Sequence, residues 1–317
     1  MGRAPSASGV RTPWSALPER VRRGVEGVLG AGVVGAVTQS GGFSPGVAVR
    51  VVLADGRRAF VKAVDTETNP LSPRFHRAEA RNAAALPEGV PAPRLLGVYD
   101  DEGWVALAFE DVVGRQPHVP WREGELGRVL GAVDRLARVL TPAPFPARSA
   151  GEVLGPDFNG WRGLVDEGRV AGAGFDPWGV RNAEWLAELA APWAGFAGGD
   201  TLAHADLRAD NMLLTDDDRV VFVDWPHAVR AAPWFDLLLM LPCVRAQGGP
   251  DPDEVFTAHP LGRAADPEGV TRTLAALAGF FLDHATRPTP PGLPTLRPFQ
   301  RAQGDAALAW LKARLKS

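Results

Sequence analysis

Four polar residues in the second half of the chain have types and spacing that could serve proton transfer and metal binding: His204, Asp206, Asn211 and Asp224. In the pattern His-x-Asp-x-x-x-x-Asn, the aspartate accepts the proton of the substrate hydroxyl and the asparagine binds a metal ion. We therefore predict that Asp206 is the catalytic base and that His204 fixes the loop. The alternative is that these side chains only satisfy backbone groups around a turn.

The residues that follow Asn211 predict a β-hairpin. Two short apolar runs, 212–214 and 220–223, flank the polar segment 215–218, which is typical of a turn. A hairpin would place Asn211, at the start of the first strand, beside Asp224, at the end of the second. Carboxylate and amide oxygens are the ligands that Mg²⁺ prefers. We therefore expect Asn211 and Asp224 to hold Mg²⁺ together.

The N-terminal part of the chain has strand and turn signals that could hold phosphates near these residues. Three apolar segments predict strands, at 33–38, 47–53 and 58–64. The glycine-rich segment 39–46 joins the first two. Glycine lets backbone N–H groups approach phosphate oxygens closely, so we predict phosphate contacts at Gly41, Gly42 and Ser44. An ordinary hairpin turn is the alternative for this segment.

Lys62, inside the third predicted strand, is the only lysine among the first 311 residues of a chain with 34 basic residues. We predict that it supplies a positive charge to the phosphates, as the strand lysine of kinases does. A helix predicted over 73–85 carries Glu79, which could hold Lys62 by an ion pair. Alternatively, Lys62 protects a sheet edge and Glu79 is a solvated helix residue.

Two more strands are predicted at 95–99 and 104–109, and the segment 110–114 then leaves the sheet. A hinge between two lobes belongs at this place. We predict that the hinge backbone, including that of Asp111, contacts the edge of an adenine ring. Phe109 and Val113 are predicted to pack near that ring.

In chain order, these motifs resemble the aminoglycoside phosphotransferase family, which consists of kinase-like small-molecule phosphotransferases. The similarity rests on Phe-Glu-Asp-Val-Val-Gly-Arg at 109–115, His-Ala-Asp-Leu-Arg-Ala-Asp-Asn at 204–211 and Val-Asp-Trp at 223–225. It extends over roughly residues 30–245. The family often has glycine where Ala205 stands, and commonly His-Pro-Gly or a similar sequence at 208–210. Neither difference affects a residue with a predicted chemical role.

The resemblance implies an α+β, bilobal, protein-kinase-like fold with ATP and Mg²⁺ as cofactors. Residues 1–113 would form the nucleotide-binding lobe, an antiparallel sheet with one main helix, and residues 1–13 are expected to be disordered. Residues 114–317 would form the larger, mostly helical catalytic and substrate-binding lobe. The resemblance also assigns Asp236 to bracing the catalytic loop, although a carboxylate near a helix N-terminus is an alternative. Helical patterns are found at 123–140, 181–196, 234–243, 267–285 and 297–316.

The acceptor is expected to be a small molecule. Only residues 225–233 separate Asp224 from the next predicted helix, whereas a protein kinase has a long activation segment ending in Ala-Pro-Glu there. We predict ATP-dependent transfer of the γ-phosphate to a hydroxyl of a small molecule, with an aminoglycoside-like antibiotic as one candidate. A metabolite kinase for a sugar, amino alcohol or fructosamine is an alternative, and so is a nucleotide-binding pseudoenzyme. The intact set of chemical residues argues against the pseudoenzyme.

Composition excludes several other classes of protein. The net charge of -3 does not suggest binding to nucleic acid or to a membrane surface. The single cysteine, Cys243, cannot form a disulfide within the chain. No apolar stretch reaches transmembrane length, and residues 1–12 lack the hydrophobic core of a signal peptide. We expect a cytoplasmic monomer.

Overall fold

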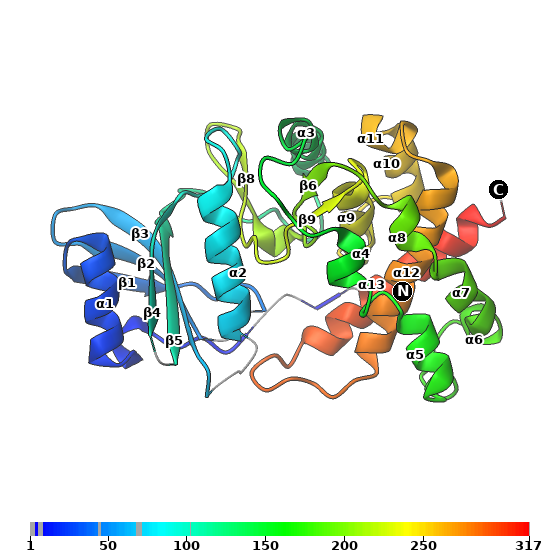
Figure 1. Cartoon of the computed structure of the whole chain (residues 1–317), viewed down its shortest axis with the longest axis horizontal. Helices are drawn as coiled ribbons and strands as arrows, with labels where there is room; N and C mark the ends of the chain where they lie inside the picture. Colours follow the sequence, from blue (N-terminus) through cyan, green and yellow to red (C-terminus); the bar gives the residue numbers. More distant parts are fainter. Residues whose placement is uncertain (1–3, 6–8, 44–45, 68–71, 102, 317) are drawn as a thin grey trace.

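The structure, a computed structural model, describes residues 4–5, 9–43, 46–67, 72–101 and 103–316. The chain forms two lobes that lie side by side (Figure 1). An antiparallel sheet dominates the N-terminal lobe, and helices dominate the C-terminal lobe. This arrangement confirms the predicted α+β, kinase-like architecture.

The N-terminal lobe is a five-stranded antiparallel sheet with the strand order β1-β2-β3-β5-β4. Its strands are β1 (Val33–Thr38), β2 (Val47–Leu53), β3 (Arg58–Asp65), β4 (Leu95–Asp101) and β5 (Trp104–Glu110). Helix α1 (Glu19–Leu29) packs on one face of the sheet, and α2 (Ser72–Ala85) lies on the other face, toward the C-terminal lobe (Figure 1).

The alternation of side chains along β3 places Lys62 on the face that looks toward α2. Its neighbours Val61 and Ala63 are fully buried in the apolar core beneath α1, where Val61 pairs with Val49 of β2. Because successive side chains in a strand point to opposite faces, Lys62 faces the other way. The position of the lysine relative to the sheet therefore follows from the strand pattern itself.

The C-terminal lobe is built of helices and two small hairpin-like sheets. The predicted catalytic hairpin is present as β7 (Met212–Leu214) and β8 (Val220–Phe222), with Met212 opposite Phe222. Strand β6 (Thr201–Ala203) pairs with β9 (Val229–Ala231). The helices are α3 (Glu123–Val139), α4 (Ala150–Leu154), α5 (Gly160–Asp166), α6 (Pro177–Arg181), α7 (Ala183–Ala190), α8 (Trp193–Phe196), α9 (Phe235–Ala246), α10 (Pro252–Ala258), α11 (Pro260–Arg263), α12 (Pro267–Ala285) and α13 (Leu296–Arg314). None of the helices in the described part of the chain is long and apolar enough to cross a membrane.

The prediction of one continuous helix over 181–196 is wrong. The segment contains two separate helices, α7 and α8, and the helical conformation is interrupted at Asn182 and Pro192. The side chain of Asn182 donates to the carbonyl of Trp178 and so ends α6. Pro192 has no N–H to donate and its ring clashes with a preceding turn, so α7 ends at Ala190.

The N-terminal segment, predicted to be disordered, is described at residues 4–5 and 9–13, where it makes backbone hydrogen bonds to both lobes. The N–H of Ala4 donates to the carbonyl of Ala246 in α9 at 2.9 Å. The N–H of Thr12 donates to the carbonyl of Gly46 at 3.0 Å. The prediction of disorder is therefore wrong for these described residues, because backbone hydrogen bonds hold them in place.

Candidate active site

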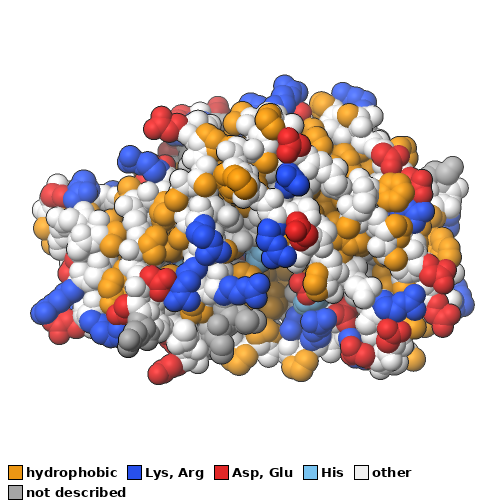
Figure 2. Space-filling view, viewed as in Figure 1, with side chains coloured by type: hydrophobic (Ala, Val, Ile, Leu, Met, Phe, Trp, Pro, Cys, Tyr) orange, Lys and Arg blue, Asp and Glu red, His pale blue; other side chains and the backbone are white. Residues whose placement is uncertain are grey.

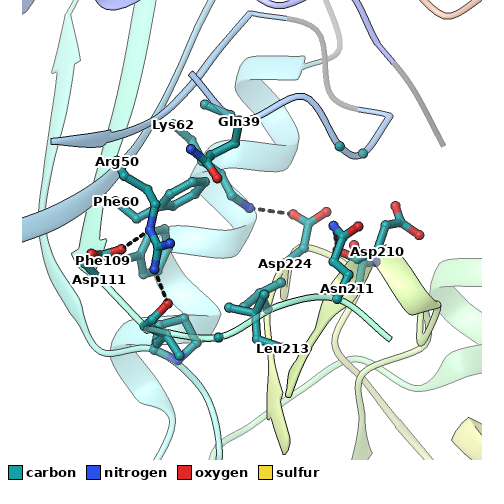
Figure 3. A pocket seen from close by; sticks show the side chains of 18 of the residues that line it. Gln39, Arg50, Phe60, Lys62, Phe109, Asp111, Asp210, Asn211, Leu213 and Asp224 are labelled. Carbon is teal, nitrogen blue, oxygen red and sulfur yellow. Dashed lines mark hydrogen bonds and ion pairs between the residues drawn. The ribbon is translucent and has the colours of Figure 1, made fainter. Parts of the chain in front are cut away.

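Lys62 lies between two carboxylates that come from opposite lobes. Its Nζ is 2.8 Å and 3.0 Å from the two carboxylate oxygens of Glu79. The same atom is 2.8 Å from Oδ1 of Asp224, a contact marked in Figure 3. Burial disfavours the charge on Lys62, but the attraction of Asp224 and Glu79 is stronger and raises the pKa of the lysine. Burial would likewise raise the pKa of Asp224, but Lys62 holds it well below its usual range. The structure brings together all three residues that the sequence singled out here.

The catalytic-loop residues Asp206 and Asn211 are in direct contact. Nδ2 of Asn211 donates to the backbone carbonyl of Asp206 at 2.8 Å and to Oδ2 of its carboxylate at 3.1 Å. Burial raises the pKa of Asp206, against the attraction of Arg208. The Asp206 carboxylate is thus held in place by neighbours on both of its oxygens.

His204 and Asp236 support the backbone of this loop, in the positions predicted for them. The carboxylate of Asp236 accepts hydrogen bonds from the N–H groups of His204 and Ala205, each at 2.8 Å. Burial lowers the pKa of His204 to about 4, so its ring is neutral at pH 7. Nε2 of this ring lies 3.0 Å from the carbonyl of Val223. Ala205 has φ 63, in the left-handed region that favours glycine, at the position where the family often has glycine.

Replacing Asp236 with alanine is expected to lower the free energy of unfolding by at least about 2 kcal/mol. Two buried N–H groups would lose their acceptor, and each costs about 1–3 kcal/mol when unsatisfied. Asp236→Asn, which keeps one carbonyl oxygen, should lose less. Denaturant unfolding of both variants measures the effect. Unchanged stability of Asp236→Ala would show that the carboxylate does not brace the loop.

Asn211 and Asp224 have free oxygen atoms that suit a magnesium ion. The amide nitrogen of Asn211 is used by Asp206, while Oδ1 of Asn211 and Oδ2 of Asp224 accept no hydrogen bond from any described residue. Both side chains line the cavity between the lobes, as Figure 3 shows. Among the described residues, no group of three or more His, Cys, Asp or Glu side chains could hold a metal ion. Two protein ligands still fit Mg²⁺, since it commonly takes its other ligands from phosphates and water.

A cavity of about 350 Å³ between the lobes lies next to Lys62 and Asp224. Gly41 and Gly42 of the glycine-rich segment line it, together with Phe109 at the end of β5. Gly42 has φ 87, which a residue with a side chain rarely adopts. Of the predicted phosphate contacts, Ser44 lies outside the described residues.

Of the two predicted hinge residues, only Asp111 lines the cavity. Val113 is 64% exposed and does not line the cavity, whereas Val112 does. The Asp111 carboxylate accepts hydrogen bonds from Arg50 at 2.5 Å and Arg58 at 2.8 Å. It thereby ties the hinge to β2 and β3. The N–H of Val112 makes no hydrogen bond to any described residue, so it can donate to an adenine edge.

Two arginines at the site were not identified from the sequence. Arg11 lines the same cavity and donates to the carbonyl of Gly41. It lies in a Gly/Ser/Pro-rich segment without periodicity, so no sequence signal could have found it. Arg208 donates to Asp206 and, at 3.1 Å and 3.0 Å, to the carboxylate of Asp210. Its position two residues after Asp206 was a usable signal.

Solved structures with this fold include enzymes that phosphorylate different small molecules. One is a thermostable mutant of aminoglycoside phosphotransferase APH(4)-Ia in a ternary complex with AMP-PNP and hygromycin B (16% identity, TM-score 0.60, covering 93% of this chain and 99% of that chain). Another is aminoglycoside phosphotransferase APH(3'')-Id from Streptomyces rimosus with ADP and streptomycin (21%, 0.51, 82% and 98%). A third is choline kinase LicA from Streptococcus pneumoniae (12%, 0.58, 92% and 98%). At these identities the likeness establishes the fold.

The sequence itself identifies the family. No curated protein matches it significantly, but the phosphotransferase enzyme family matches residues 40–280, most of the chain. That match includes strands β2 to β5, the hinge, the catalytic loop and the hairpin described above. The chain therefore belongs to the phosphotransferase enzyme family.

Proposed function

We propose that this protein transfers the γ-phosphate of ATP to a hydroxyl group of a small molecule. The observation that carries the proposal is the position of Lys62, which bridges Glu79 of α2 and Asp224 of the C-terminal lobe. In kinases, the equivalent lysine–glutamate pair positions the nucleotide phosphates. Asp206 would orient and deprotonate the acceptor hydroxyl, because its carboxylate lies on the same loop as Asn211.

Asn211 and Asp224 would hold Mg²⁺, which neutralises charge on the transferred phosphoryl group when it is bound. The solved structures with AMP-PNP and with ADP support a nucleotide in the cavity between the lobes. Catalysis of this kind depends on positioning and on charge. The cytoplasmic location and the monomeric state remain predictions from the sequence.

The acceptor classes left open by the sequence are an aminoglycoside-like antibiotic and a metabolite such as a sugar, amino alcohol or fructosamine. A nucleotide-binding pseudoenzyme is disfavoured, since Lys62, Asp206 and Asn211 are all present and in contact with their expected partners. The test is Mg²⁺-dependent ADP formation across a panel of hydroxylated compounds. Nucleotide binding without turnover on any of them would favour the pseudoenzyme.

Asp224→Asn is expected to weaken Mg²⁺-dependent ADP binding at least about tenfold, in the range seen when metal sites lose a supporting group. Binding without Mg²⁺ should change little, because the glycine-rich segment and Lys62 remain. Isothermal titration with and without Mg²⁺ measures both values. Asp216→Asn, in the exposed turn of the same hairpin, is the matched control. An equal loss in both conditions would make Asp224 a structural residue instead.

A further inference from the structure

A second cavity, of about 230 Å³, is lined by Asp206 and mostly by apolar side chains. Six of them come from α4, α9, α12 and the segment before α5: Leu154, Phe158, Leu239, Leu277, Phe280 and Phe281. Leu154, Phe280 and Phe281 remain partly exposed to it. Apolar surface that stays accessible inside a cavity favours a ligand that can cover it.

The cavity carries little negative charge. Its carboxylates are Asp206, which is already paired with Arg208, and Asp157, whose side chain is 50% exposed. On the face shown in Figure 2, Lys and Arg side chains gather around the junction between the lobes. A ligand with several ammonium groups would therefore place buried charges against apolar side chains without partners, which is costly.

Two glutamines of α13 add polar groups at one side of this cavity. Gln303 is 3% exposed, and its side-chain amide makes no hydrogen bond to any described residue. Gln300 is 9% exposed and uses Oε1 to accept from Arg297 at 2.7 Å. The amide atoms of Gln303 keep some accessible surface, so a ligand or water in the cavity can supply their hydrogen bonds. Gln303 can both donate and accept, so it suits a neutral polar group such as a hydroxyl, carbonyl or amide.

Building on the function proposed above, we infer that the acceptor is a neutral or singly charged alcohol with at least one apolar ring. The ring would lie against Phe158, Phe280 and Phe281, and a neutral polar group would bind the amide of Gln303. The acceptor hydroxyl would reach Asp206, which lines the same cavity. In the transfer, the oxygen of this hydroxyl forms a bond to the γ-phosphorus of ATP as the bond to the ADP oxygen breaks. The hydroxyl proton goes to Asp206. This chemistry favours such an alcohol over a polycationic aminoglycoside.

Binding is measured by isothermal titration of the full chain, with and without Mg²⁺–ADP. The ring-bearing probes are 2-phenylethanol, phenylalaninol and tryptophanol, and the basic antibiotics hygromycin B and streptomycin form the second arm. Kinetics with Mg²⁺–ATP follow for every compound that binds. We expect the ring-bearing alcohols to bind and the antibiotics to bind at least about tenfold more weakly, a factor that corresponds to 1.4 kcal/mol.

Gln303→Leu, which removes the amide at similar size, should raise the Kd or KM of phenylalaninol and tryptophanol by up to about tenfold, the range for one buried hydrogen bond. Its affinity for ADP should be unchanged, because Gln303 does not line the nucleotide cavity. Gln247→Leu makes the same substitution at a buried glutamine that lines neither cavity and should leave the acceptor Kd unchanged. Gln303→Glu adds one negative charge and should improve binding of streptomycin.

Tighter binding of the antibiotics than of the alcohols would overturn the proposed acceptor class, and so would an absence of binding by the ring-bearing probes. Neither result tests the proposed phosphoryl transfer itself. That function is tested by Mg²⁺-dependent nucleotide binding and by ADP formation. Conversely, binding of the ring-bearing probes to a protein without any nucleotide binding would support the cavity's selectivity and overturn the proposed phosphotransferase role of the site.

Discussion

Asp206→Ala is expected to lower turnover at least about a hundredfold, the low end of what general acid–base catalysis contributes. Nucleotide binding should stay nearly intact, because Asp206 lines the second cavity and does not line the cavity between the lobes. Single-turnover kinetics and a nucleotide titration on the same preparation measure the two effects.

Asp206→Asn is the matched variant for this experiment. Arg208 and Asn211 each donate to a different oxygen of the carboxylate. An asparagine keeps one of these two acceptor oxygens, but it is a poor proton acceptor. Both variants should therefore be slow. Near-normal turnover of Asp206→Asn would show that the side chain positions the loop and does not accept the proton.

Lys62→Arg is expected to fold normally, to bind ATP at least about tenfold more weakly and to turn over at least about a hundredfold more slowly, as when one positioned donor is lost. Lys62 is 14% exposed and its Nζ touches two carboxylates at 2.8 Å. The larger, planar guanidinium does not fit a site shaped for a compact ammonium. Nucleotide affinity, rate and melting temperature are measured together.

Two further variants complete the test of Lys62. Lys62→Ala should be no more active and should also be less stable, because it leaves Glu79 buried without its cation. Lys312→Arg makes the same conservative change on α13, where Lys312 pairs with Asp176. It should change neither affinity nor rate. An active Lys62→Arg enzyme with unchanged ATP affinity would remove Lys62 from the phosphate site.

The local pattern of the sequence was enough to predict where Lys62 and the hairpin after Asn211 lie. Alternation in β3 turns Lys62 away from the core under α1, and the two apolar runs after Asn211 fold into the predicted hairpin. These features depend on period and turn chemistry, which act over a few residues. Helix α2, which was predicted from its own residues, places Glu79 in contact with Lys62. The prediction of a continuous helix over 181–196 was wrong for a local reason as well, because the helix-interrupting residues Asn182 and Pro192 lie within the apolar pattern.

By itself, then, the sequence determined the kinase-like order of elements and the residues that meet at Lys62 and Asp206. Only the tertiary structure decided what surrounds them. Arg11 reaches the cavity between the lobes from the far end of the chain. The second cavity is lined by residues as far apart in the sequence as Leu154 and Gln303. Its apolar character could not be read from the sequence, because an apolar helix face looks the same whether it packs against another helix or remains open to a ligand.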